Sequence, residues 1–438
     1  MDRRDFSRLS GVALAGLAVP TPLRDLAGWR PQELRVDGER LNRWLAELAP
    51  MGANAGGGQD RVAFSDADLE GRAWVAGLMR EAGLDVSVDL AGNLWGKRAG
   101  TEPGLLPLVL GSHIDSVPNG GNYDGTLGSL AAVEVATRLK EAGLAPRHPL
   151  HVVVFANEEG GKTGSRILAG TLEERELELP TASGHTIGEG LRRVGGDPSR
   201  LAEARMEPGS FAAYLELHIE QGAVLDDHGE DIGVVRGIVG IMRWNVTVEG
   251  MTNHAGTTPM RERRDAMVAA ARFVDAVHTT VTEWPGGPVA TVGRLEAEPG
   301  VPNVIPGRAT LSLEIRALTM EAIEEIQATL ARKADDIGGA TGTAFAFDRF
   351  YVSGAAPATP ALQDVVEEAA RGLGLTTRRM PSGAGHDAQS MAHLGPMGMI
   401  FVPSVRGISH APGEYTSPED CAHGADVLLR AFLALDRG

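Results

Sequence analysis

Four short apolar runs recur along the chain, and a histidine or a carboxylate follows each of them. The runs occupy residues 106–110, 152–155, 214–217 and 399–402. Continuous apolar segments of this length are typical of strands that are buried on both faces of a sheet. Open α/β sheets bind their ligands at the carboxyl ends of the strands. The pattern therefore predicts that the polar residues after the four runs gather at one edge of a sheet.

The periodicity divides the chain into two kinds of region. From about residue 32 to 235, and again from 355 to 438, helical and extended patterns alternate as in an α/β domain. Between them, strands are expected at 243–249, 289–295, 310–316 and 345–351, and helices at 265–281 and 319–337. This order matches a ferredoxin-like α+β module. We therefore predict one α/β domain formed by residues 31–237 and 353–438, split by a small domain at residues 238–352.

The composition excludes several classes of protein. A length of 438 residues is more than one domain usually has, and 43% hydrophobic residues allow substantial cores. The net charge of −17 argues against a nucleic-acid partner, because such proteins present a basic face. The single cysteine, Cys421, excludes a disulfide within the chain and a cysteine-rich zinc site. Any metal would therefore be held by histidines and carboxylates.

Residues 1–30 have the pattern of an export signal. Arg3 and Arg4 precede a modestly apolar stretch at residues 9–19, as in twin-arginine signal peptides. This stretch is too short to cross a bilayer as a stable helix, so no stable membrane anchor is expected. We predict export by the twin-arginine route to the periplasm or the cell exterior. The alternative is a cytoplasmic protein with an apolar leader.

The first candidate site follows the run at 106–110. His113 and Asp115 lie on the same side of an extended chain, because side chains alternate along a strand. Asp115 can therefore accept a hydrogen bond from one ring nitrogen of His113 and leave the other for a metal. The Gly-rich segment 118–125 can return Asp124 to the same place, where its two oxygens can bridge two metals. The alternative for a single histidine is a hydrogen-bonded surface side chain.

Two adjacent carboxylates, Glu158 and Glu159, follow the run at 152–155. Their burial without a partner would be costly, and a nearby metal would remove that cost. One of them can bind a metal while the other takes a proton from the attacking water. A carboxylate works best as such a base when its pKa is raised toward neutrality. A solvated acidic pair is the alternative. Because His218 and His410 follow the remaining runs, the set of histidines and carboxylates can complete two metal sites with a shared ligand.

Five motifs lie in succession at residues 111–125, 157–160, 216–222, 253–259 and 409–414. In their content and order they resemble the hydantoinase/carbamoylase family of di-metal amidohydrolases, within the aminoacylase/carboxypeptidase-like superfamily. That family includes N-carbamoyl-L-amino acid hydrolases, allantoate amidohydrolases and β-ureidopropionases. The resemblance covers nearly everything after residue 35.

The resemblance implies a fold, a metal centre and partners. The fold would be a di-metal peptidase-like α/β catalytic domain with a mixed central sheet flanked by helices, split by an inserted ferredoxin-like lid or dimerisation domain. Glu158 would be the general base. Each subunit would hold two divalent ions, which would be zinc, or else manganese or cobalt. A homodimer and a small substrate with a carboxylate and an amide or ureido group are also implied. The implied metal ligands, with Asp124 as the bridge, are His113, Asp124, Glu159, His218 and His410.

The resemblance further implies that Gln221, His254, Asn303 and Arg316 bind the substrate. His254 would donate to the substrate carbonyl or its oxyanion, often across a dimer, and would thus be catalytic. Arg316 lies on the polar face of its strand and can grip a carboxylate with two bonds, although a salt bridge to Glu314 is the alternative. His254 and Asn303 could equally be turn residues. The segment 382–387, which contains His386, also matches a family segment near the pocket.

Two features depart from the family pattern. Many relatives carry an aromatic residue after the glutamate pair, where this chain has the smaller Thr163 and then the bulky Arg166, which could alter the substrate pocket. An export signal is also unusual for the family. The predicted activity is hydrolysis of linear amide or ureido C–N bonds, with N-carbamoyl-L-amino acids or ureido acids such as allantoate as substrates. The alternatives are an aminoacylase or dipeptidase on the same scaffold, and a binding protein that lacks catalysis.

Overall fold

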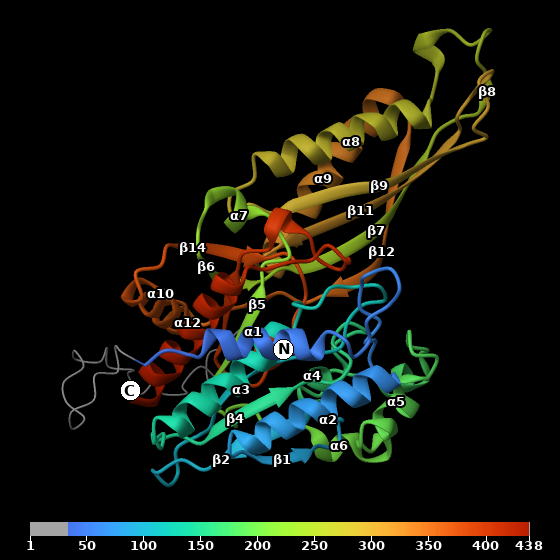
Figure 1. Ribbon diagram of the computed structural model, residues 1–438. Helices are drawn as coiled ribbons and strands as arrows, with labels where there is room; N and C mark the ends of the chain where they lie inside the picture. The colour runs from blue at the N-terminus through green and yellow to red at the C-terminus, as the bar shows by residue number, and fades with distance from the viewer. Residues whose placement is uncertain (1–33, 438) are drawn as a thin grey trace, which may run out of the picture.

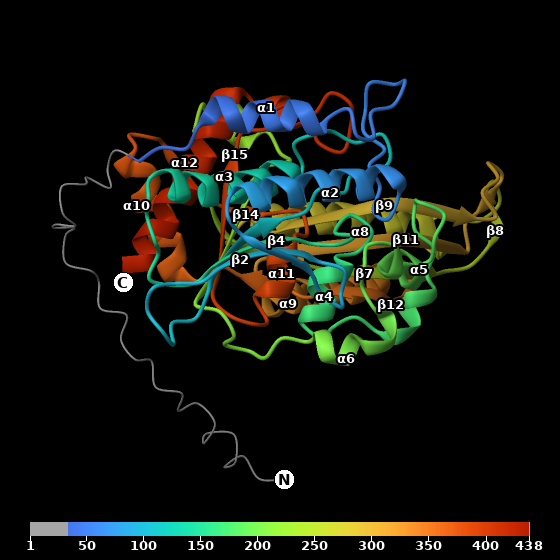
Figure 2. The same cartoon turned by 60° about the horizontal axis from the view of Figure 1, so that its bottom comes forward.

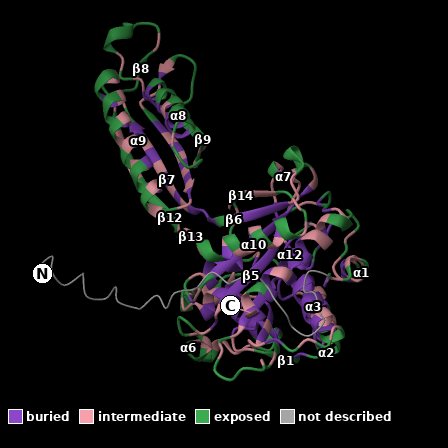
Figure 3. Cartoon of the chain, turned by 90° about the vertical axis from the view of Figure 1, so that its left-hand side faces the viewer, coloured by how far each residue is buried: buried purple, intermediate pink, exposed green. Residues whose placement is uncertain are grey.

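The computed structural model describes residues 34–437, so the export signal predicted for residues 1–30 lies outside the described residues. A larger lobe holds a nine-stranded sheet, and a smaller lobe holds a four-stranded sheet (Figure 1). The two lobes join near β6, β12 and β13 (Figure 3). Within residues 34–437, no helix has both the length and the apolar character needed to cross a bilayer.

The large sheet is mixed, and its central strands are parallel. Its order is β1-β2-β4-β3-β5-β15-β6-β13, and β14 also pairs with β6. β3 runs parallel to β4 and β5, and β15 runs parallel to β5, whereas β2 and β6 are antiparallel to their neighbours β4 and β15. The predicted mixed α/β sheet is therefore confirmed. The strand bounds are β1 (Asp85–Val88), β2 (Leu94–Arg98), β3 (Leu108–Ser112), β4 (Leu150–Val154), β5 (Ala213–Ile219), β6 (Ile232–Ile238), β13 (Ala356–Pro357), β14 (Thr377–Ser382) and β15 (Met397–Val402).

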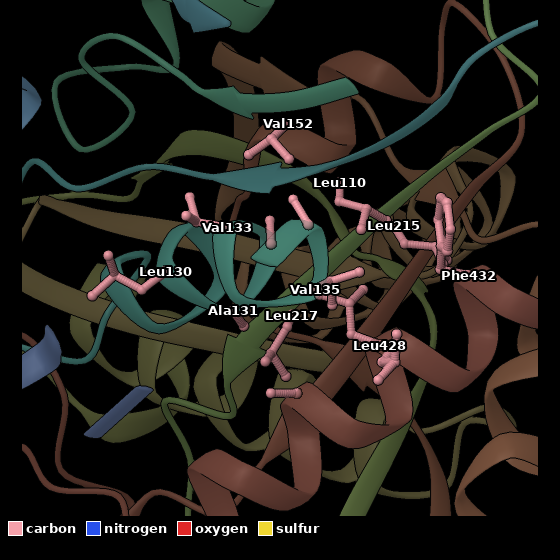
Figure 4. Close-up of a cluster of buried hydrophobic side chains, with 14 of the residues drawn as sticks. Leu110, Leu130, Ala131, Val133, Val135, Val152, Leu215, Leu217, Leu428 and Phe432 are labelled. Atoms are coloured by element: carbon pink, nitrogen blue, oxygen red, sulfur yellow. The ribbon is translucent and has the colours of Figure 1, made fainter. Parts of the chain in front are cut away.

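Helices cover both faces of this sheet, which explains why its central strands are apolar throughout. On β3, Leu108 and Leu110 belong to one core, and Val109 belongs to the core on the other face. Figure 4 shows the first core, where side chains of α3 and α12 meet those of the strands. The second core lies beneath α4, α5 and α11, and Figure 2 shows α4 and α6 on the side of the sheet opposite α1, α2 and α3.

The helix bounds of the large lobe are α1 (Gly38–Leu48), α2 (Asp66–Glu81), α3 (Thr126–Glu141), α4 (Thr163–Leu168), α5 (Ile187–Arg193), α6 (Leu201–Ala204), α7 (Val224–His228), α10 (Pro360–Gly372), α11 (Asp387–Met391) and α12 (Pro418–Arg437). Ser65 caps α2, because its hydroxyl accepts a hydrogen bond from the backbone N–H of Asp68. The start of α2 is thus fixed by a local sequence signal.

The small lobe has the ferredoxin-like order that its periodicity predicts. Its antiparallel sheet has the order β12-β7-β11-β9, and α8 and α9 pack on one face. On β11, Leu311, Leu313 and Ile315 are buried against the helices, whereas Glu314 and Arg316 lie on the other face. The short pair β8–β10 was not predicted. The bounds are β7 (Gly240–Glu249), β8 (Asn253–His254), α8 (Ala266–Thr282), β9 (Val289–Glu298), β10 (Val304–Ile305), β11 (Arg308–Ala317), α9 (Met320–Thr341) and β12 (Ala344–Ser353).

Candidate metal centre and active site

The polar residues that follow the four apolar runs converge at one edge of the large sheet. His113 follows β3, and Glu158 and Glu159 follow β4. His218 lies near the end of β5, and the loop after β15 carries His410. Because these four strands are neighbours and run parallel, their carboxyl ends meet. A cavity of about 200 Å³ at this edge is lined by all five of these side chains and by Asp124.

Asp124 occupies the middle of the cluster, and its two oxygens face different groups. Its Oδ1 lies 3.4 Å from Nε2 of His113 and 3.2 Å from Nε2 of His218. Its Oδ2 lies 3.4 Å from Nε2 of His410, and that nitrogen also lies 3.4 Å from Oε1 of Glu159. Each group is compact enough to hold one metal ion. The carboxylate of Asp124 is therefore placed to bridge two ions.

Backbone carbonyls orient both buried histidines. Nδ1 of His113 lies 3.0 Å from the carbonyl oxygen of Asp115, and Nδ1 of His218 lies 2.8 Å from the carbonyl oxygen of Ile219. Since a carbonyl only accepts hydrogen bonds, each Nδ1 carries the proton and each Nε2 keeps a lone pair toward Asp124. This arrangement suits metal ligation.

The role predicted for the Asp115 carboxylate is wrong in one respect. Its Oδ1 lies 3.7 Å from Nδ1 of His113, too far for a hydrogen bond, and the carbonyl of the same residue takes that place. The carboxylate instead accepts hydrogen bonds from the backbone N–H groups of Glu158 at 3.2 Å and Glu159 at 3.1 Å. Asp115 therefore links the histidine of β3 to the glutamate pair that follows β4.

Gly125 allows the Asp124 loop to approach the histidines closely. Its φ of 61° lies in the left-handed region, and a Cβ at this position would overlap the imidazole of His113. Gly125 is also the N-cap of α3, so the loop ends and the helix begins at this glycine. A larger residue would displace His113.

The electrostatics of the cavity favour cations. Asp124 and Glu158 are 7% and 8% exposed, and the side chain of Glu159 is 11% exposed. Burial, together with the charges of Asp124 and Glu158, raises the pKa of Glu159 to about 10. Burial is also the main cause that raises the pKa of Glu158. Oε1 of Glu159 has no hydrogen-bond partner among residues 34–437. Bound cations would compensate the buried charge, and nitrogen with oxygen donors suits zinc, manganese or cobalt.

Glu414 is a structural residue that the sequence did not single out, although it ends one of the five motifs. Its Oε1 accepts hydrogen bonds from the backbone N–H groups of Tyr123 at 2.8 Å and Asp124 at 3.0 Å. Its Oε2 accepts from the Ser409 hydroxyl at 3.0 Å and the His410 N–H at 3.2 Å. Burial and the charge of Asp124 raise the pKa of Glu414 above its usual value. Glu414 thus ties together two loops that each carry a candidate ligand.

Two of the predicted substrate residues lie at the cavity or beside it. Nε2 of Gln221 donates to Oδ2 of Asp124 at 2.6 Å. Arg316 lines an adjacent cavity of about 550 Å³, which shares Gln221 and Ala384 with the metal cavity. The Arg316 guanidinium donates to Glu314 at 2.7 Å and to the carbonyl of Gly383 at 2.7 Å. The salt bridge to Glu314 considered as an alternative is therefore present, and Arg316 faces the cavity as well.

The other two predicted substrate residues lie away from the metal cluster of the same chain. His254 is in β8, which pairs with β10, and the backbone N–H of Ala255 donates to the carbonyl of Asn303. This strand pair lies at the far end of the small lobe (Figure 1). The structure brings His254 and Asn303 together with each other and leaves them outside the two cavities described above.

His386 lies beside the centre, and Arg166 does not. The rings of His386 and His218 are 4.4 Å apart, and Nε2 of His386 lies 2.8 Å from the Ser382 hydroxyl. Burial and the charge of His218 lower the pKa of His386. Arg166 instead makes two hydrogen bonds of 2.7 Å with Glu176. The bulk of Arg166 is therefore held away from the substrate pocket by that ion pair.

A mixed α/β sheet whose strand ends carry two histidine–carboxylate groups around one shared aspartate has the architecture of a metal-dependent hydrolase. The comparison with known families agrees, because residues 109–434 match the model of peptidase family M20/M25/M40. The chain belongs to this family, within its hydantoinase/carbamoylase amidases, and is an amidohydrolase of C–N bonds other than peptide bonds.

Three relatives illustrate the match. The N-carbamoyl-L-amino acid amidohydrolase of Geobacillus stearothermophilus is 40% identical, over 92% of this chain and 100% of that protein. The ureidoglycolate hydrolase of Arabidopsis thaliana is 38% identical, over 92% of this chain and 88% of that protein. The crystal structure of a hydantoinase/carbamoylase family amidase from Burkholderia multivorans superposes with a TM-score of 0.83 at 37% identity, over 92% and 99% of the two chains.

Proposed function

We propose that this protein hydrolyses linear ureido acids, with N-carbamoyl-L-amino acids or related compounds such as allantoate as substrates. The observation that carries the proposal is the Asp124 carboxylate, whose two oxygens face two separate groups of nitrogen and oxygen ligands. The names of the relatives support the substrate class, because they act on N-carbamoyl-L-amino acids and on ureidoglycolate. The buried glutamate beside the two groups supports a hydrolytic role.

In the proposed centre, each half of the Asp124 carboxylate would help to hold one divalent ion. His113 and His218 would complete one site, and Glu159 and His410 the other. Zinc, manganese and cobalt all suit this donor set. When bound, such ions polarise the scissile carbonyl and make water acidic enough to attack at neutral pH.

Glu158 would be the general base. Its Oε2 lies 3.8 Å from Nε2 of His113, so it borders the group without being one of its compact ligands. Burial raises the pKa of Glu158, which suits a carboxylate that takes a proton from water and later gives it up. The carbonyl carbon gains the water oxygen, the C–N bond breaks, and Glu158 delivers the proton to the departing nitrogen.

Arg316 and Gln221 would orient the substrate. The guanidinium of Arg316 is held at Nε by Glu314, and it lines the larger cavity beside the metal cavity. A positive group there can bind the α-carboxylate of a ureido acid. The Gln221 amide lies between Asp124 and His410, where it can direct the carbamoyl group toward the centre.

We further propose that the protein is a homodimer in which His254 and Asn303 serve the centre of the second copy. The position of the β8–β10 pair at the far end of the small lobe supports this. Light scattering of the purified protein tests it, and a monomer at assay concentrations would contradict it. Export by the twin-arginine route is also a proposal, and the test is to fuse residues 1–30 to a reporter and follow its location.

The central test combines a substrate panel with Glu158→Gln. We expect the native protein to release ammonia from N-carbamoyl-L-amino acids in the presence of manganese, cobalt or zinc. Glu158→Gln should retain metal, measured by elemental analysis, and lose at least about hundredfold in kcat because it removes proton transfer. Glu419→Gln on the exposed start of α12 is the control. Loss of metal from Glu158→Gln would contradict its role, and release of amino acid only from acyl or dipeptide substrates would contradict the substrate class.

A further inference from the structure

We propose that Lys162 binds a second acidic group of the substrate, so that the preferred substrates are ureido acids with two carboxylates. This inference rests on the proposed hydrolysis of ureido acids and adds a specificity residue to it. It starts from the turn between β4 and α4, which carries the glutamate pair at one end and Lys162 at the other.

The turn directs Lys162 toward the metal cavity. The carbonyl of Glu158 accepts hydrogen bonds from the backbone N–H groups of Gly161 at 2.9 Å and Lys162 at 2.7 Å. These bonds hold Lys162 at a φ of 57°, a conformation that is uncommon for residues other than glycine, asparagine and aspartate. Strained backbone of this kind is often found at functional sites. The same turn that presents Glu158 therefore fixes the direction of the lysine.

The ammonium group of Lys162 reaches the wall of the cavity opposite its own turn. Lys162 and Gly385 both line the metal cavity. A Cβ placed on Gly385 would lie 2.7 Å from Nζ of Lys162, so the ammonium lies directly over the Gly385 backbone. Its charge partly offsets the burial that raises the pKa of Glu158, and it adds to the burial that lowers the pKa of His386. The positive charge of Lys162 therefore acts on groups that line the cavity.

Lys162 differs from the arginines of the adjacent cavity because it has no carboxylate partner. Arg316 pairs with Glu314, Arg378 with Glu230, and Arg379 with Asp364 and Glu367. Within residues 34–437, the Lys162 side chain makes neither an ion pair nor a hydrogen bond. With two divalent ions bound, Asp124 and Glu159 would serve as ligands, and Glu158, which is not a ligand, would act as the base without forming an ion pair with Lys162. The ammonium of Lys162 therefore remains available for an anionic ligand.

The loop at residues 383–385 relates Lys162 to the proposed carboxylate anchor. Arg316 donates to the carbonyl of Gly383 at one end of this loop, and Lys162 lies over Gly385 at the other. Residues 383 and 384 form a bend, and even a fully extended pair of residues spans no more than about 7 Å. The two cations therefore lie close enough together to bind the two carboxylates of one small dicarboxylic amino acid. One carboxylate would bind Arg316 and the other Lys162.

The test compares N-carbamoyl-L-glutamate with N-carbamoyl-L-glutamine, which has the same size and the same α-carboxylate but a neutral side chain. Lys162→Asn removes the charge and keeps a residue that tolerates a positive φ. We expect the native protein to favour the glutamate compound, and Lys162→Asn to lose about tenfold or more in kcat/KM for it alone, as for the loss of one charge-assisted bond. Lys162→Arg should keep the preference. Lys333→Met, on α9, is the control for loss of a lysine.

A binding measurement separates recognition from turnover. In the Glu158→Gln background, calorimetry should show that Lys162→Asn weakens binding of N-carbamoyl-L-glutamate by about tenfold and leaves N-carbamoyl-L-glutamine unchanged. Equal losses for both compounds, or no loss for either, would overturn the role of Lys162. If the native protein hydrolyses both compounds equally well, this inference fails and the proposed function stands. If the native protein releases ammonia from no ureido acid, the proposed function itself fails.

Discussion

Glu414→Gln tests whether one buried carboxylate holds the two halves of the candidate metal centre together. The carboxylate accepts four hydrogen bonds, two from the loop of Asp124 and two from the loop of His410. Glutamine has nearly the same volume, so it leaves no cavity. Its amide keeps one accepting oxygen and turns the other acceptor into a donor. A hydroxyl can rotate to accept, but a backbone N–H such as that of His410 would then face another donor.

The expected loss follows from these bonds. A hydrogen bond to a charged group contributes about 1.5–3 kcal/mol, and a buried donor left without a partner costs about 1–3 kcal/mol. Glutamine forfeits one such bond outright and weakens the others by removing the charge of Glu414. We therefore expect the free energy of unfolding to fall by about 2–4 kcal/mol at pH 8. Metal affinity should fall as well, because the hydrogen bonds that hold the loops of Asp124 and His410 in place are weakened.

Urea unfolding followed by circular dichroism, with and without a chelator, measures the first effect, and calorimetric metal titration measures the second. Glu419→Gln is the matched control, because Glu419 is exposed and its ion pair with His423, at 3.9 Å, is long and solvated. Its effect should stay below about 0.5 kcal/mol. The reasoning is refuted if Glu414→Gln unfolds at the same urea concentration as the control and binds metal with native affinity.

Two further predictions concern other positions. Burial and the charge of Lys97 lower the pKa of His151 to about 4, so protonation of His151 favours the unfolded chain. As the pH falls from 6.5 to 4, the free energy of unfolding of the native protein should therefore fall by about 1–2 kcal/mol relative to that of His151→Gln. A difference between the two proteins that stays constant in urea unfolding across this pH range would contradict the prediction. Gly125→Ala should lower the free energy of unfolding by about 1–2 kcal/mol through backbone strain and should also weaken metal binding, because the new Cβ overlaps His113. Gly57 has a φ of 81° and open space around it, so Gly57→Ala should show the strain alone. Equal metal affinity in both variants would contradict the effect of the overlap.

The elements and the meeting point of the centre were predictable because they depend on local signals. A continuous apolar run such as Val152–Phe155 is long enough for one buried strand, and its length and flanking turns distinguish it from a helix. Parallel strands then bring their ends together whatever the order of the strands. For this reason His113 and Glu159 could be placed at one edge without knowing that β4 and β3 are neighbours. The small lobe was equally accessible, since its two central strands, β7 and β11, alternate between buried and partly exposed residues.

The contacts between loops were not predictable in the same way. Glu414 is separated from Asp124 by 290 positions, and nothing in its local pattern distinguishes a carboxylate that accepts backbone N–H groups from a solvated one. The carbonyl and the carboxylate of Asp115 compete for the same histidine, and only the conformation of the loop decides between them. The β8–β10 pair is too short to have a period. These features depend on how loops that are distant in the sequence pack together, and the periodicity of hydrophobic residues carries no information about that packing.

The position of Arg316 supports the proposal that His254 serves the centre of a second copy. Arg316 pairs with Ile241 near one end of the small sheet, and Arg308 lies at the other end of the same strand, toward the β8–β10 pair. Eight residues of strand span about 27 Å. Because the sheet is continuous, closure of the small lobe that carried the β8–β10 pair to the metal cavity would pull Arg316 away from the carbonyl of Gly383. In the proposed homodimer, Arg316 would serve one centre and His254 the other, so that both residues could act at once.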